Sequence, residues 1–386
     1  MFGKVRRMEP LDALRGIAAI GLAIGSWAAF SSWAEYDFIR NLQLSADFIL
    51  VVAGFIVSRA HRDQLAESHR VGRYLFARFG RHFPLHAGAL ALVLLVDVVV
   101  RQVGDPKDFL SSLLLLHPFA PGASAWNPAA WVVAAELWMS FLFAGVCMLG
   151  VMTTHLGRIA TFLVVAGFVS IRMSYGAEAL GVVDLALRGA AAFLLGALLQ
   201  SFVALRGVTI ALRKTKKAIG TGLEIYGVAS ILAFFVLAPP ELAPIAPFVF
   251  ASCLFIFLRL KCIVSEVLDA AWPQKLGELS YAIVLTHLIL VAPLRDYALV
   301  APANKVDAVA LVGAPLFIMV VIGLARCAHL VFDKPTRSAM SAWAERVFPE
   351  RPEYDYDDDG EGLTGAEAAR EPAPVERKSN AEAAPL

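Results

Sequence analysis

The apolar stretch that decides the fold lies near the N-terminus and reads LDALRGIAAIGLAIGSWAAFS over residues 11–31. A hydrocarbon core about 30 Å thick requires a helix of about 20 such residues. Three cations, Lys4, Arg6 and Arg7, precede the stretch, as they do in a signal peptide. The apolar segment is too long for a signal peptide, however, and no small-residue cleavage site follows it cleanly. We therefore expect a first membrane helix that is retained.

The same criterion predicts about ten membrane helices, and the composition agrees with it. Hydrophobic residues make up 58% of the 386 residues, charged residues only 17%, and the mean hydropathy is +0.66. These values exclude a soluble protein, so we expect an all-α integral membrane protein built as a bundle of about ten transmembrane helices. The piece 109–118 is too short to span and predicts an interfacial helix or part of a re-entrant loop. The predicted spans are 11–31, 44–60, 83–100, 129–152, 157–172, 182–204, 218–238, 243–260, 278–294 and 306–330.

The basic residues are distributed unequally between the predicted loops. With a cytoplasmic N-terminus, 21 Lys and Arg residues fall in the cytoplasmic loops and termini, and 6 fall in the outer loops. Short loops rich in Lys and Arg remain in the cytoplasm. The sequence therefore predicts a multi-pass protein of the inner (plasma) membrane with both termini in the cytoplasm.

The last part of the chain differs from the membrane body. From Glu350 to Leu386 the sequence holds 11 acidic and 4 basic residues, with several Pro and many Ala. Such a segment cannot bury enough apolar surface to offset the entropy lost on ordering. We expect a polytopic membrane domain at residues 1–348 and a disordered cytoplasmic tail at 349–386.

The cysteines give no sign of a metal site or a disulfide framework. All four, at positions 147, 253, 262 and 327, lie in or beside apolar stretches, without a CxxC pair or a histidine at ligand spacing. We therefore expect no disulfide framework and no structural zinc. Separately, we expect no bound cofactor and no nucleic-acid partner.

Two pairs of charges lie close to the cytoplasmic ends of predicted spans. Asp12 and Arg15 stand three residues apart on one face of the first helix. They form either a local ion pair at the interface or an anion-binding arginine in a cytoplasmic cavity. Arg78 and Arg81 have the same spacing just before the third span. They are either a topology signal that contacts anionic lipid or an arginine pair that binds phosphate.

Further polar residues lie inside the apolar spans, where an ionisable group costs about 2.5–3.5 kcal/mol and usually faces a cavity, a partner or a substrate path. Glu136 either makes a structural hydrogen bond to another helix or lines a cavity together with Asn127 and Trp131. His287 is either a satisfied core histidine or a proton acceptor. Asp47 is either a helix-end charge or part of an acceptor site. Together these residues indicate a polar path from a basic cytoplasmic face into the bundle.

The strings that carry these residues resemble the integral-membrane acyltransferase 3 family. Residues 11–18, LDALRGIA, differ at one position from that family's first-helix motif, LDGLRGIA. Five more motifs follow in the family's order up to about Arg337: FILVVAGFI at 48–56, Arg78-x-x-Arg81-x-x-Pro84, Asn127-Pro128-x-x-Trp131 followed by Glu136, Ser280-Tyr281 through His287, and Asp333-Lys334-Pro335-Thr336-Arg337.

The resemblance implies a membrane O-acyltransferase that moves an acyl group from acyl-CoA to a hydroxyl of a sugar or envelope glycan. The partners it implies are acyl-CoA as donor substrate, a carbohydrate or glycolipid acceptor, and the lipid bilayer. We expect the catalytic residues to be His287, Glu136, Arg15 and Ser26, and the substrate-binding residues to be Arg78, Arg81, Asp12, Asp47, Asn127, Trp131 and Tyr281.

One position departs from the family pattern. The family's presumed general base is a histidine eleven residues after the first-helix arginine, and this chain has Ser26 there. The two positions share a helix face and lie about 16 Å apart along the axis. Because a serine hydroxyl is not basic and itself needs a base, we expect His287 to remove the proton, or Ser26 to do so through another group. The alternative is a catalytically inactive homologue that acts as a transporter, sensor or binding protein.

Overall fold

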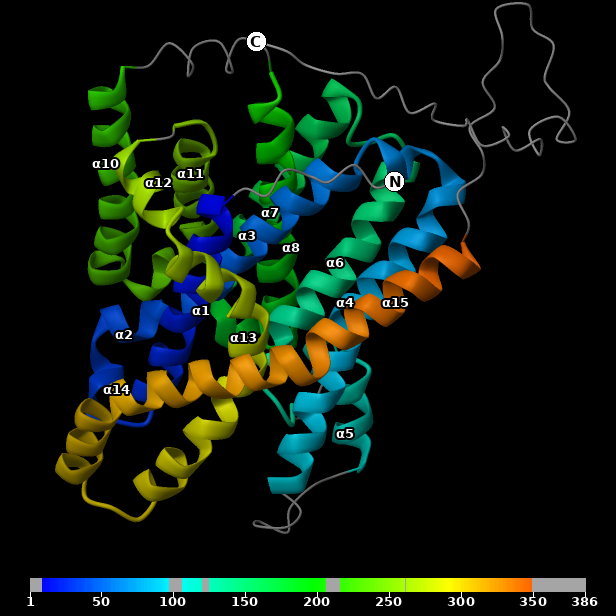
Figure 1. Ribbon diagram of the computed structural model, residues 1–386. Helices are drawn as coiled ribbons and strands as arrows, with labels where there is room; N and C mark the ends of the chain where they lie inside the picture. The colour runs from blue at the N-terminus through cyan, green and yellow to red at the C-terminus, as the bar shows by residue number, and fades with distance from the viewer. Residues whose placement is uncertain (1–8, 97–105, 120–124, 206–215, 261, 349–386) are drawn as a thin grey trace, which may run out of the picture.

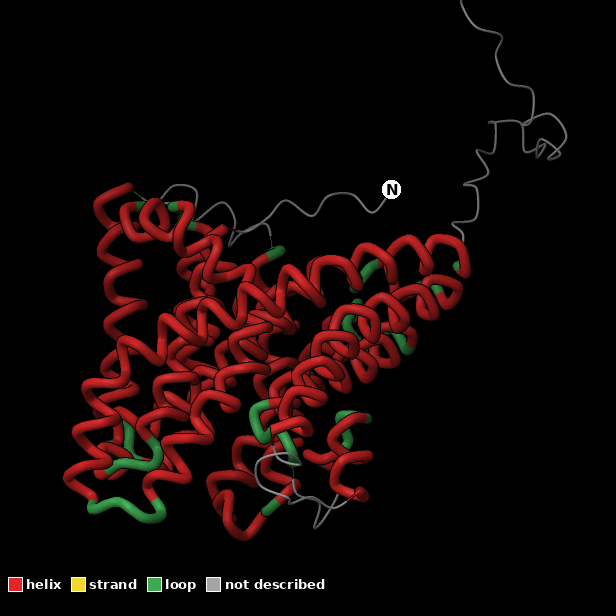
Figure 2. The backbone as a smooth tube through the Cα atoms, turned by 60° about the horizontal axis from the view of Figure 1, so that its bottom comes forward, coloured by secondary structure: helices red, strands yellow, loops and turns green. Residues whose placement is uncertain are grey.

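The computed structural model describes residues 9–96, 106–119, 125–205, 216–260 and 262–348. Over these ranges the regular structure is entirely helical (Figures 1 and 2), which confirms the predicted all-α class. Ten of the described segments are long and apolar enough to cross a membrane, and each overlaps one predicted span. The tail predicted at 349–386 lies outside the described residues.

Long helices form the bundle and short helical turns connect several of them. The long helices are α1 (Glu9–Ala28), α3 (Ser45–His61), α4 (Ser68–Val96), α6 (Ala130–Met148), α7 (His155–Leu180), α8 (Val182–Val203), α10 (Lys217–Leu237), α11 (Ala246–Arg259), α13 (Ala271–Ala298), α14 (Ala303–Ala328) and α15 (Lys334–Val347). The short elements are η1 (Ser32–Glu35), α2 (Asp37–Asn41), η2 (Leu42–Leu44), η3 (Gln64–Ala66), α5 (Pro106–Leu113), η5 (His117–Phe119), η6 (Pro240–Ile245), α12 (Ile263–Leu268) and the π-helical turn η7 (His329–Asp333).

The start of the third span differs from the prediction. The span was expected at 83–100, with Arg78 and Arg81 in the loop before it, whereas α4 begins at Ser68 and carries both arginines on the helix. Tyr74 and Arg78, four residues apart, are both buried. A buried face at this spacing stabilises a helix through a segment whose charges alone indicate a loop.

Two pairs of helices form the centre of the bundle, α1 with α13 and α3 with α8. Glycines allow both pairs to approach closely. A Cβ atom on Gly54 of α3 would lie 1.9 Å from the carbonyl oxygen of Phe193 in α8. A Cβ atom on Gly277 of α13 would lie 2.2 Å from the carbonyl oxygen of Asp12 in α1. The polar residues of α1 are therefore held directly against α13.

The last helices cross the bundle as one long rod. Figure 1 shows α14 and α15 in orange, joined through η7, with α15 running beside α4. Glycines of α4 receive side chains of this rod, because Gly80 faces Met340 and Gly88 faces Phe332. This packing brings Lys334 and the rest of the first turn of α15 close to the basic part of α4.

Candidate active site

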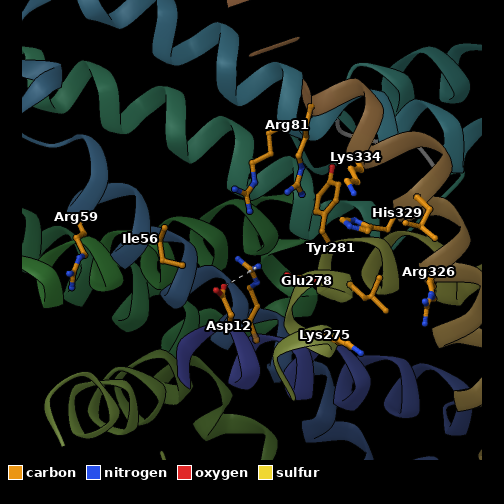
Figure 3. Close-up of a pocket in the computed structure, with 14 residues that line it drawn as sticks. Asp12, Ile56, Arg59, Arg81, Lys275, Glu278, Tyr281, Arg326, His329 and Lys334 are labelled. Atoms are coloured by element: carbon orange, nitrogen blue, oxygen red, sulfur yellow. Dashed lines mark ion pairs between the residues drawn. The ribbon is translucent and has the colours of Figure 1, made fainter. Parts of the chain in front are cut away.

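A cavity of about 740 Å³ opens among α1, α3, α4, α13 and the rod formed by α14, η7 and α15. In Figure 3, Arg81 and Lys334 reach the cavity from one side, and Asp12 and Lys275 from the opposite side. The lining contains two acidic side chains, Asp12 and Glu278, against seven basic ones: Arg15, Arg59, Arg81, Lys275, Arg326, Lys334 and Arg337. A concave site with this excess of cations is suited to a polyanionic ligand.

Arg15 is held at the wall of this cavity by contacts with two helices. Its Nε donates to the Ser280 hydroxyl at 2.9 Å, and one terminal nitrogen lies 3.4 Å from the carbonyl oxygen of Gly277. The same nitrogen is 3.5 Å from the Asp12 carboxylate, which is the local ion pair considered from the sequence. Arg15 thus pairs with Asp12 and also lines the basic cavity, and its role as an anion-binding residue stays a prediction.

Arg78 and Arg81 of α4 occupy different places. Arg81 lines the cavity together with Tyr281, whose hydroxyl donates to the carbonyl oxygen of His82 at 2.6 Å. Arg78 is not among the residues that line this cavity; it is buried, with its guanidinium carbon 5.4 Å from the centre of the Tyr74 ring. Among the described residues, Arg81 is therefore the member of the predicted pair placed to contact a ligand in this cavity.

The rod adds cations that the sequence analysis did not assign to the site. Arg326, Lys334 and Arg337 line the cavity, and Arg337 also pairs with Asp333 at 2.8 Å. Their spacing in the sequence indicates a shared helical face. Lys334 follows Arg326 by eight residues, and Arg337 follows Lys334 by three. This shared face was missed because residues 331–337 were expected to follow the last span rather than to continue its helix.

Glu136 faces a histidine that the sequence analysis also missed. Its Oε1 lies 3.6 Å from Nε2 of His82, a fully buried side chain of α4. In the described part of the chain, neither ring nitrogen of His82 has a hydrogen-bond partner. The carboxylate and the imidazole therefore form a polar contact between α6 and α4 with hydrogen-bonding capacity that is still available.

Ser26 and His287 are direct partners deeper in the bundle. His287 is fully buried, with Nδ1 3.0 Å from the carbonyl oxygen of Ile283 and Nε2 3.2 Å from Oγ of Ser26. A carbonyl oxygen can only accept, so Nδ1 carries the proton and the lone pair of Nε2 faces the serine hydroxyl. The serine at the family's histidine position thus contacts the one histidine that the sequence places near the middle of a span.

A second buried group lies next to this pair. Arg188 of α8 binds the buried Asp47 carboxylate, with three nitrogen–oxygen distances of 2.8 to 3.0 Å, and its guanidinium carbon lies 4.8 Å from the centre of the Trp131 ring. It also donates to the carbonyl oxygen of Gln43 at 2.9 Å, and the Gln43 side chain donates to Ser26 at 3.2 Å. Arg188 therefore neutralises the Asp47 carboxylate. Through the Gln43 carbonyl, Arg188 also positions the residue whose side chain contacts Ser26.

The segment between α5 and α6 contacts α13 two residues before His287. Asn127 donates to the carbonyl oxygen of Leu285 at 2.8 Å, whereas its buried Oδ1 has no partner in the described structure.

His117 of η5 is also buried. This burial, and to a smaller extent the nearby His86, lowers the pKa of His117 to about 4. The imidazole of His117 is therefore neutral near pH 7.

The predicted site residues thus separate into two layers. Asp12, Arg15, Arg81 and Tyr281 line the cavity. Ser26 and His287 lie deeper, and the helix α1, which carries both Arg15 and Ser26, separates the layers by about 16 Å. Among the described residues, no cluster of three or more His, Cys, Asp and Glu side chains could hold a metal ion.

These features define a polytopic membrane protein with a polar site enclosed by its helices, and comparison with known families identifies it further. The model of the acyltransferase 3 family, described as an acyltransferase domain, matches residues 9–327. The chain belongs to this family and is an acyltransferase that transfers groups other than amino-acyl groups. Neither the curated proteins nor the solved structures provide a match.

Proposed function

We propose that the protein transfers an acyl group from acyl-CoA to a hydroxyl of a sugar or envelope glycan. The observation that carries this proposal is the cavity of about 740 Å³, with its seven basic and two acidic side chains. Coenzyme A is a polyanion because of its phosphate groups, and arginine binds phosphate oxygens in a bidentate manner. The volume lies in the range of about 300–1,000 Å³ that is common for ligand pockets.

The proposed orientation places this cavity at the cytoplasmic face of the inner membrane, with both termini in the cytoplasm. The excess of Lys and Arg in the corresponding loops supports this orientation. Figure 1 is consistent with it, since α5 and the connection between α13 and α14, which both fall in predicted outer loops, both lie toward the bottom of the bundle. The donor then enters from the cytoplasm, where acyl-CoA is found, and the acceptor from the opposite side.

The deeper layer supplies the chemistry in this proposal. Arg15 and Arg81 bind the phosphates, and the acyl thioester extends along α1 toward His287. A base such as the Nε2 of His287 contributes about 100- to 10,000-fold to a proton-transfer step. The Oδ1 of Asn127 has no partner in the described structure and is suited to accept a hydrogen bond from an acceptor hydroxyl. The reaction uses acyl-CoA as a substrate and requires no bound cofactor.

The test is to incubate membranes containing the protein with a series of radiolabelled acyl-CoA donors, acetyl-CoA first, and a panel of envelope glycans. We expect label transfer to fall at least about 100-fold in Arg15→Ala and His287→Ala. Arg40→Ala is the matched control, because this exposed arginine lies outside the cavity and pairs with the nearby Asp37 at 3.2 Å. Transfer that both substitutions leave unchanged would refute the site. Absence of transfer with every acyl-CoA would favour the inactive homologue.

A further inference from the structure

The contact between Ser26 and His287 has the geometry of an activated serine. The hydroxyl oxygen lies 3.2 Å from Nε2 of His287, and the other ring nitrogen is fixed at 3.0 Å from the carbonyl oxygen of Ile283. A nucleophile within about 2.6–3.2 Å of a base, with the base oriented by a third group, is the arrangement that activates serine in many enzymes. In this protein the orienting group is a backbone carbonyl.

A second contact fixes the direction of the serine proton. The side-chain amide of Gln43 donates to Oγ of Ser26 at 3.2 Å, so this partner cannot accept the hydroxyl proton. The proton is therefore directed at Nε2 of His287, where the lone pair lies. The same amide donor would stabilise negative charge on Oγ as the proton leaves.

A serine and a histidine at residue 26 serve different chemical roles. An imidazole at residue 26 would act as a base in a direct transfer, whereas a hydroxyl with an adjacent imidazole acts as a nucleophile. Ser26 is also slightly more accessible than its partner, with 8% of its surface exposed against 0% for His287. The departure at residue 26 therefore changes the role of this position without removing the means of catalysis.

We propose, resting on the acyl-CoA-dependent function above, that Ser26 carries the acyl group as a covalent ester. In the first step Oγ attacks the thioester carbonyl while Nε2 of His287 takes the hydroxyl proton. The carbon–sulfur bond breaks, and the departing sulfur takes this proton and leaves as the CoA thiol. In the second step the acceptor hydroxyl attacks the serine ester and gives its proton to His287. The carbon–oxygen bond to Ser26 breaks, and His287 returns the proton to Oγ.

The position of Ser26 suits such a carrier. It lies about 16 Å from Arg15 along α1, well inside the bundle relative to the basic cavity. A covalent intermediate lets the donor leave on one side before the acceptor enters from the other. The two substrates then need not occupy the bundle at the same time, and the kinetics follow a ping-pong pattern.

The experiment uses the full chain, purified in lipid nanodiscs, with radiolabelled acetyl-CoA and no acceptor. We expect label to remain on the denatured protein, to resist neutral hydroxylamine and to be released by alkali, as an oxygen ester is. Ser26→Ala should carry no label, and Ser26→Cys should carry a thioester that neutral hydroxylamine cleaves. Thr286→Val is the matched control and should keep the label, because the buried Thr286 hydroxyl donates only to its own helix, to Ala282 at 2.8 Å.

The outcomes separate this inference from the function on which it rests. If the parent transfers label to a glycan but never carries it, or if Ser26→Ala transfers within about threefold of the parent rate, Ser26 is not the nucleophile and the proposed function stands. If the parent releases no thiol from any acyl-CoA with any acceptor, both proposals fail. Thermal unfolding of Ser26→Ala at the parent temperature ensures that loss of label reports chemistry rather than misfolding.

Discussion

The contact between α1 and α13 gives the sharpest prediction, through the substitution Gly277→Ala. The new Cβ atom would lie 2.2 Å from the carbonyl oxygen of Asp12, whereas ordinary contact begins at 3.4 Å. Because the obstacle is backbone, no side-chain rotation relieves it. The two helices must separate by about 1 Å at this point, and overpacking of this kind costs about 1–3 kcal/mol.

A separation of this size reaches both layers of the site. The hydrogen bond from Arg15 to Ser280, now 2.9 Å, would lengthen beyond 3.5 Å, and the contact between Ser26 and His287, now 3.2 Å, would weaken in the same direction. A misplacement of about 1 Å at reacting groups costs about 100-fold in rate. We therefore expect Gly277→Ala to lower the rate about 100-fold and also to lower the unfolding temperature.

The assay measures the initial rate of acyl transfer at saturating donor, together with thermal unfolding in the same detergent. Gly167→Ala in α7 is the control, because a Cβ atom there meets nothing within 4 Å. The control should keep the parent rate. A Gly277→Ala protein with the parent rate and unfolding temperature would refute the argument that close approach of α1 and α13 sets the site geometry.

Three further predictions concern single residues. Ser26→His should keep transfer to the acceptor, since an imidazole there serves as a base, but should carry no alkali-labile label; a labelled Ser26→His protein would place the nucleophile elsewhere. Asp47→Asn should destabilise the protein by about 3–5 kcal/mol, measured by unfolding, because it leaves the Arg188 charge buried without its partner; an unchanged unfolding midpoint would contradict this. Burial lowers the pKa of His117 to about 4 in the folded protein, whereas the unfolded chain binds the same proton near pH 6.5. The free energy of unfolding should therefore fall by on the order of 3 kcal/mol as pH drops from about 6.5 to 4. His117→Gln should reduce this acid sensitivity of the unfolding temperature, and an identical pH dependence would show that other groups cause it.

The fold could be predicted because each membrane helix carries its own signal. In a bilayer every backbone polar group must be satisfied within the protein, so an apolar run of sufficient length predicts a helix whatever surrounds it. The start of α4 was not predicted by this rule, because the basic segment at its N-terminal end has the composition of a loop. The burial of Tyr74 and Arg78 depends on neighbouring helices, which local composition does not report.

The site was predictable only in part, for a similar reason. Arg15 and His287 stand out as ionisable groups in apolar runs, so the sequence alone singles them out. The contact between Ser26 and His287 does not follow from the sequence, because it joins residues 261 positions apart. The pairing of Asp47 with Arg188 likewise joins two helices, α3 and α8, whose adjacency arises only on folding.

In the proposed mechanism the basic cavity binds the donor and the deeper layer carries out the chemistry. Steady-state kinetics over a range of acyl-CoA concentrations separate these two roles in one measurement. Arg337→Gln in the basic cavity should raise the KM for acyl-CoA about tenfold with little change in kcat, because it removes a cation that contributes to donor binding. His287→Ala in the deeper layer should lower kcat at least about 100-fold and leave that KM nearly unchanged. Loss of kcat alone in both proteins, or parent kinetics in both, would contradict a donor site at the cavity and chemistry at His287.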